Sequence, residues 1–91
     1  MTKYSIFTKY TSNRETKRIN DITLDILDWT LIQCSPVTRI NRRDNRTSLD
    51  YEGDIGEFRS IFDEAMKKVK DIAYQSNISL PRIYLAPNSR N

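Results

Sequence analysis

The feature that most constrains the fold is a series of apolar residues at three- and four-residue spacing between positions 54 and 75. This spacing places apolar side chains on one face of an α-helix. Asp54 is the expected N-cap, and Glu57, three residues later, completes a variant of the capping box. The chain therefore needs a second layer against which this amphipathic helix can pack. The apolar positions are Phe58, Ile61, Phe62, Ala65, Met66, Val69, Ile72 and Ala73.

Two further segments predict strands at the ends of the chain. Residues 4–10 are rich in aromatic and β-branched side chains, which favour strands. Residues 81–87 predict a short strand bracketed by Pro81 and Pro87. Because proline lacks the N–H that a central ladder needs, this strand either starts and stops abruptly or lies at an edge of a sheet. Residues 88–91 are expected to form a frayed tail.

Residues 37–52 predict a β-hairpin with its turn at Asp44 and Asn45. In the register set by this turn, Arg42 faces Thr47, Ile40 faces Leu49 and Thr38 faces Tyr51. Arg39 and Asp50 then face each other on the opposite side of the sheet. Both an apolar pair and an opposite-charge pair support this register.

Residues 21–34 allow two interpretations. Apolar residues alternate with polar ones, but the phase changes near Ile26 and Leu27, which a β-bulge would explain. The alternative is a helix capped by Asn20 or Asp21. We favour the strand because apolar residues would spread around almost the whole circumference of a helix. The polar residues 11–20 are expected to form a basic loop.

These elements predict a single α+β domain over residues 1–91. Its order would be β-β-β-β-α-β, with a small antiparallel sheet of four to five strands. One C-terminal amphipathic helix would pack on one face, or two helices if residues 21–34 are a second helix. A single helix covers only part of such a sheet, so some sheet surface would stay available to a partner.

The residue types of most catalytic sites are scarce. The chain has no histidine, two glycines and one cysteine. A serine or cysteine triad therefore lacks its base, and no glycine-rich phosphate loop is present. Asp50, Glu52 and Asp54 alternate and could hold Mg²⁺, but pairing, solvation and helix capping explain them separately. We expect no enzyme activity, no cofactor and no metal, and a buried, inert thiol at Cys34.

Charge alternates in sign along the chain, and two basic clusters are the main candidates for partner binding. The predicted hairpin carries Arg39, Arg42, Arg43 and Arg46, and the predicted loop carries Arg14, Lys17 and Arg18. Guanidinium groups bind phosphates and carboxylates through paired N–H donors. If both clusters lie at one end of the sheet, they form a basic patch sufficient for salt-sensitive binding of nucleic acid.

Aromatic side chains supply further candidates. Tyr10 lies beside the basic loop and Tyr84 lies in the proline-bracketed strand, so these two are the expected exposed aromatic pair. Core packing is the better expectation for any other single aromatic residue, Trp29 included. The exposed strand 82–86 could pair with another chain, which would make a homodimer.

Two functional hypotheses follow. The composition favours Ile, Asn, Lys and Tyr over Ala, Gly and Pro, a bias that is common in AT-rich bacteriophages and mobile elements. With no catalytic chemistry, it suggests a non-enzymatic protein-binding module that inhibits a host protein or defence complex. The alternative is a small nucleic-acid-binding protein that uses the Arg39–Arg46 tip. The sequence lacks a signal peptide and an apolar span, so we expect a cytoplasmic protein with no membrane contact.

Overall fold

The computed structural model describes residues 2–34 and 36–87, and its element order is β-α-β-β-α-β. The elements are β1 (Thr2–Phe7), α1 (Arg14–Ile32), β2 (Val37–Arg43), β3 (Arg46–Tyr51), α2 (Ile55–Gln75) and β4 (Tyr84–Pro87). The predicted α+β class is confirmed, with two helices in place of one. The tail predicted at 88–91 lies outside the described residues.

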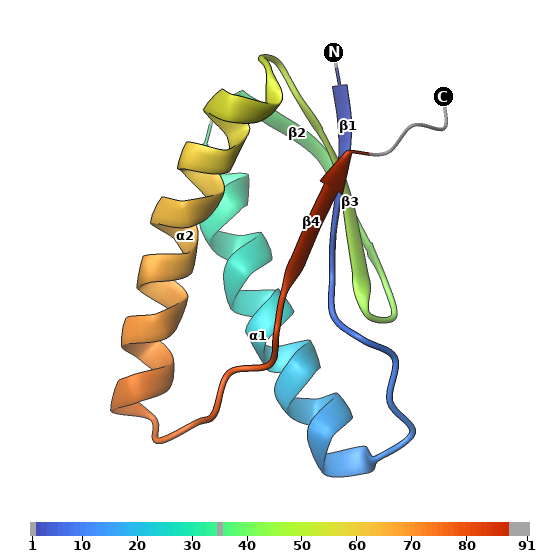
Figure 1. Ribbon diagram of the computed structural model, residues 1–91, viewed down its shortest axis with the longest axis vertical. Coiled ribbons are helices and arrows are strands. Elements are labelled where there is room, and N and C mark those ends of the chain that lie inside the picture. The colour runs from blue at the N-terminus through green and yellow to red at the C-terminus, as the bar shows by residue number, and fades with distance from the viewer. Residues whose placement is uncertain (1, 35, 88–91) are drawn as a thin grey trace.

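The four strands form one antiparallel sheet in the order β2-β3-β1-β4. Both helices lie on the same side of this sheet (Figure 1). This is the split β-α-β arrangement, which hosts many unrelated functions and therefore does not identify one. β4 is an edge strand, as predicted, although it begins three residues later than the predicted segment. No helix in the described part of the chain has the length and apolarity needed to cross a membrane.

The favoured strand over residues 21–34 is wrong, and so is most of the predicted loop over 11–20. Both segments belong largely to α1, which begins at Arg14 after the N-cap Asn13. The Asn13 side chain accepts a hydrogen bond from the Thr16 backbone N–H at 2.9 Å, which satisfies one of the free donors at a helix start. Some apolar residues of α1 are buried and others are exposed, and this explains why apolar and polar residues alternate irregularly over residues 21–34.

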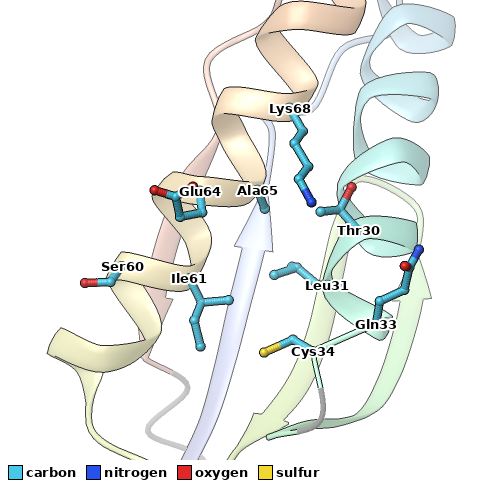
Figure 2. A pocket seen from close by; sticks show the side chains of 9 residues that line it. All are labelled: Thr30, Leu31, Gln33, Cys34, Ser60, Ile61, Glu64, Ala65 and Lys68. Atoms are coloured by element: carbon cyan, nitrogen blue, oxygen red, sulfur yellow. The ribbon is translucent and has the colours of Figure 1, made fainter.

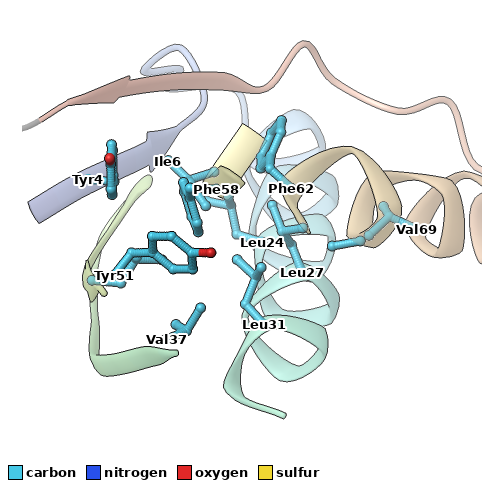
Figure 3. Packing of buried hydrophobic residues seen from close by; sticks show 12 residues of the cluster. Tyr4, Ile6, Leu24, Leu27, Leu31, Val37, Tyr51, Phe58, Phe62 and Val69 are labelled. Carbon is cyan, nitrogen blue, oxygen red and sulfur yellow. The ribbon is translucent and has the colours of Figure 1, made fainter. Parts of the chain in front are cut away.

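The core fills the space between the helices and one face of the sheet (Figure 3). Leu24, Leu27 and Leu31 of α1 are almost fully buried there. Phe58 of α2 stacks on Tyr4 of β1, with ring centroids 4.7 Å apart. Such aromatic pairs add about 0.5–1.5 kcal/mol beyond the area they bury. The other side of this core comes from α2, which contributes Phe58, Phe62, Ala65 and Val69, with Ile61 and Met66 packed against them. Ile72, predicted for the same face, is 42% exposed.

α2 begins and ends with defined caps. The Asp54 carboxylate accepts a hydrogen bond from the Glu57 backbone N–H at 2.8 Å, so the predicted N-cap is confirmed. At the other end, the N–H groups of Asn77 and Ile78 donate to carbonyls of the last turn. Asn77 has φ 56°, which makes this end a Schellman motif with asparagine in the left-handed position.

The hairpin has the predicted turn, but its register changes along β2. Arg42 pairs with Thr47, as predicted, and Arg43 pairs with Arg46. The register shifts between Thr38 and Asn41, so Thr38 pairs with Asp50 and the predicted pairing with Tyr51 is wrong. Two residues of β2 here oppose one residue of β3, which is a β-bulge. The predicted bulge near Ile26 and Leu27 does not exist, because that segment is helical.

Candidate functional site

The pairing of β2 with β3 beside the turn determines which of the arginines there face the helices. We call the side of the sheet that carries the helices the inner face and the opposite side the outer face. Arg42 lies on the inner face, where its guanidinium contacts the Asp25 carboxylate and donates to the Asp21 carbonyl at 3.2 Å. Its Nε lies 4.0 Å from a carboxylate oxygen of Asp28. These contacts hold the hairpin against α1, so Arg42 stands apart from the other hairpin arginines.

Asp28 is the half-buried acidic group of this contact. Its carboxylate accepts a hydrogen bond from the Thr47 hydroxyl at 2.7 Å. Burial raises the pKa of Asp28 above its ordinary value, and the hydrogen bond from Thr47 opposes part of that shift. The ionised form is therefore costly at this position, and the nearby guanidinium of Arg42 reduces the cost.

The other three hairpin arginines lie on the outer face. Arg39 is largely exposed and its guanidinium lies 3.7 Å from the buried carboxylate of Asp50, so the predicted charge pair forms. The predicted register that sets Arg39 directly opposite Asp50 is wrong, because Thr38 occupies that position. Arg43 and Arg46 are exposed cross-strand partners beside the turn. Lys3 adds a further exposed cation on β1, opposite Asp50. Asp50 is the single acidic residue among the outer positions of the four strands, so this face is basic.

Two aromatic rings join this basic face at the end nearest the hairpin turn. Phe7 of β1 pairs with Arg46 on one side and with Tyr84 on the other. The Phe7 and Tyr84 rings stack with centroids 5.3 Å apart. The Arg46 guanidinium lies 4.5 Å from the centroid of Phe7, and that of Arg82 lies 5.5 Å from the centroid of Tyr84. We call these four residues the arginine–aromatic row.

The row fixes two guanidinium groups at a basic surface. Arginine stacks favourably on aromatic faces and still presents N–H donors at its edges. Because the rings already support Arg46 and Arg82, these side chains lose less freedom when an anion binds. Within residues 2–34 and 36–87, no helix covers the outer face (Figure 1). Its chemistry therefore suits an extended polyanion.

The second predicted basic cluster lies on a helix and not on a loop. Arg14, Lys17 and Arg18 occupy the first turns of α1 and are exposed. The Lys17 ammonium pairs with the Asp21 carboxylate at 3.2 Å. Lys17 also lines a pocket together with Asp44 and Asn45 of the hairpin turn, so the start of α1 lies beside that turn, but none of the hairpin arginines lines this pocket.

The predicted aromatic candidates have different environments. Tyr10 is 81% exposed, whereas Tyr84 is half-buried in the arginine–aromatic row. Sequence reasoning did not select Phe7, Arg82 or Lys3. These residues come together only because β1 pairs with both β3 and β4. The prolines that bracket the last strand indicated an edge position for it, but they did not indicate that β1 is the strand beside it.

The helical side of the molecule carries a shallow apolar groove between α1 and α2 (Figure 2). Leu31, Ile61 and Ala65 contribute apolar lining, and the half-buried Cys34 lies at one end. Trp29 and Ile32 on α1 are 69% and 63% exposed, so the expectation of a core position for Trp29 is wrong, as it is for Tyr74 on α2, which is 88% exposed. This is a second surface with interface-like composition.

No cluster with metal-binding composition is found in the described ranges, where no three His, Cys, Asp or Glu side chains come close enough together to hold an ion. Asp50, Glu52 and Asp54 are accordingly not gathered into a site. Comparison with known protein families, with curated proteins and with solved structures finds no match to this chain.

Proposed function

We propose that the protein is a non-enzymatic binding protein for single-stranded nucleic acid, which it holds on the outer face of the sheet. The arginine–aromatic row carries this proposal. Proteins that bind single strands combine a basic surface that follows the backbone with aromatic side chains that contact bases. Arg46 and Arg82 would bind phosphates, and Arg43 and Lys3 would extend the basic surface on either side.

The number of free cations sets the expected salt dependence. Among the residues that the structure describes, Arg39 is already paired with Asp50, which leaves Lys3, Arg43, Arg46 and Arg82 as the cations of the outer face without an ion-pair partner there. Four phosphate contacts predict that log Kobs falls with log[salt] with a slope of about −2.8. Affinity should therefore fall about 50-fold between 50 and 200 mM salt.

Fluorescence anisotropy with a labelled 12-nucleotide strand tests the proposal. Arg43→Ala combined with Arg46→Ala should lower the affinity and reduce the salt slope by about 1.4. Arg59→Ala removes an exposed arginine from α2 and is the matched control, for which we expect an unchanged slope. A wild-type protein that does not bind the strand at 50 mM salt would refute the proposal, as would equal slopes for the double variant and the control.

A second candidate is the protein-binding module, in which the chain inhibits a host protein as a phage or mobile-element product. The exposed Trp29 and Ile32 on α1 favour it. It predicts a stoichiometric protein complex that survives nuclease treatment and is lost with Trp29→Ala. Arg46→Ala, on the other side of the molecule, should leave this complex intact.

A further inference from the structure

Tyr10 is an exposed aromatic side chain beside a small cavity at one end of the arginine–aromatic row. It lies in the segment that joins β1 to α1 and is 81% exposed. The cavity has a volume of about 160 Å³, and its walls come from this segment, from the first two turns of α1 and from the residues before β4. We call it the Tyr10 cavity. Its walls include Lys9, Tyr10, Pro81 and Arg82.

The Tyr10 cavity adjoins the arginine–aromatic row at Arg82, which belongs to both. The Arg82 guanidinium lies 5.5 Å from the centroid of the Tyr84 ring, and the residue is exposed. Only two residues separate Phe7 of the row from Tyr10 along the chain. A nucleic-acid strand that crosses the sheet along the row therefore reaches the Tyr10 cavity after Arg82.

The rings of the row are already occupied by other side chains. Phe7 lies between Arg46 and Tyr84, with the Arg46 guanidinium 4.5 Å from its centroid and the Tyr84 centroid at 5.3 Å. Tyr84 in turn packs against Phe7 and Arg82. In the part of the chain that the structure describes, no aromatic ring or guanidinium stacks on Tyr10. Tyr10 therefore offers a base an open ring face, which the row does not.

The charge around the Tyr10 cavity suits a polyanion. Lys9 and Arg82 are exposed and are the charged residues among those that line it, and no carboxylate belongs to its walls. The larger pocket that Tyr10 also lines contains the carboxylates of Asp21 and Asp44. Because carboxylates repel phosphates, the smaller cavity is the better site for a base and its attached backbone.

The size and lining of the Tyr10 cavity suit one base. Its volume is below the range of about 300–1,000 Å³ for sites that enclose a whole small ligand. Every nucleobase has a π-face that stacks on aromatic side chains, so this contact is tolerant of sequence. In a duplex the bases are paired and stacked on one another, and placing one of them on Tyr10 would require it to unpair and leave the stack.

We propose that the Tyr10 cavity receives one unpaired base of the strand held on the outer face. The base stacks on Tyr10, while Arg82 holds the adjacent phosphate and Lys9 adds positive charge beside it. This inference rests on the proposed function, and it assigns the residue that distinguishes single strands from duplexes. Phosphate contacts alone do not make that distinction, because both kinds of nucleic acid present phosphates.

Fluorescence anisotropy with dT12, with the same 12-nucleotide backbone lacking all bases and with a 12-base-pair duplex tests the inference. Tyr10→Ala should weaken dT12 binding at least about fivefold and leave binding of the abasic strand unchanged. The salt slope should not change, because no cation is removed. Tyr10→Phe should keep wild-type affinity, since its ring also stacks. Tyr74→Ala removes a tyrosine that is 88% exposed on α2 outside the cavity, and this matched control should bind all three probes as the wild type does.

The outcomes separate the two proposals. If the wild-type protein does not bind dT12 at 50 mM salt, both the proposed function and this inference fail. If it binds dT12 and Tyr10→Ala weakens that binding less than twofold, the base cavity is wrong and the backbone surface stands. Equal weakening of dT12 and the abasic strand would also contradict a base contact. Tyr10→Ala should lower the ratio of dT12 affinity to duplex affinity by the same factor as it lowers dT12 affinity, and an unchanged ratio would show that Tyr10 does not select single strands.

Discussion

Two adjacent arginines, Arg42 and Arg43, should respond oppositely to the same substitution. Arg42→Ala removes the contacts that the guanidinium makes with α1, and Arg43→Ala removes an exposed side chain from the outer face. We expect Arg42→Ala to destabilise the fold with little effect on the outer face. Arg43→Ala should weaken strand binding and leave stability unchanged.

The structure gives the size of the Arg42 effect. Its pair with Asp25 contributes less than about 1 kcal/mol because the Asp25 side chain is 63% exposed. The hydrogen bond to the Asp21 carbonyl and the pair with Asp28 are better shielded, since the side chains of Arg42 and Asp28 are 22% and 18% exposed. Together these interactions suggest a loss of about 2 kcal/mol. For a domain of this size that lowers Tm by about 10–15 °C.

Urea unfolding and thermal melts followed by circular dichroism measure both variants. Arg43→Ala should stay within about 0.5 kcal/mol of the wild-type free energy of unfolding, as exposed substitutions usually do. Two variants of equal stability would show that Arg42 does not face α1. That result would also remove the reason for assigning strand binding to Arg43 rather than to its neighbour.

Two further substitutions test the C-terminal end of α2 and the half-buried carboxylate of Asp28. Asn77→Gly should raise the free energy of unfolding by about 0.5 kcal/mol, because glycine adopts the left-handed conformation at this position without steric cost; a loss of stability in urea would contradict the Schellman assignment. Asp28→Asn should gain stability over wild type as pH rises through the raised pKa of Asp28, because the ionised carboxylate disfavours the fold there. Below the ordinary pKa of 3.8, the difference in unfolding free energy between the two proteins should not change with pH. If this difference also stays the same from pH 3.5 to 7, the pKa of Asp28 is not raised.

The sequence predicts α2 well and α1 poorly, for one physical reason. α2 buries a single stripe, so Phe58, Phe62, Ala65 and Val69 appear at helical spacing. α1 instead exposes Trp29 and Ile32 while it buries the polar Asn20 and Thr23. Its apolar residues therefore surround the helix, and the hydrophobic pattern contains no clear face.

The hairpin turn and the Arg39–Asp50 pair could be predicted because both depend on neighbouring positions in one hairpin. The arginine–aromatic row could not, because it joins residues 7, 46, 82 and 84 through the pairing of β1 with β3 and β4. Because acidic and basic segments alternate along the chain, the sequence also gave no indication of the basic outer face. The carboxylates of Asp25 and Asp28 on α1 contact Arg42 on the inner face, and the other three hairpin arginines lie on the outer face.

The bulge in β2 has a consequence for how this protein can change through insertions and deletions. Val37 and Arg42 both point toward the helices, although five positions separate them and a regular strand would place them on opposite faces. The extra residue between Thr38 and Asn41 shifts the alternation by one position, so both Val37 and Arg42 face the helices. Deleting one residue there would leave the turn and its arginines in place and rotate Val37 out of the core. A one-codon deletion in this strand would thus cost stability first, while the chemistry of the outer face would persist in whatever fraction of the chain still folds.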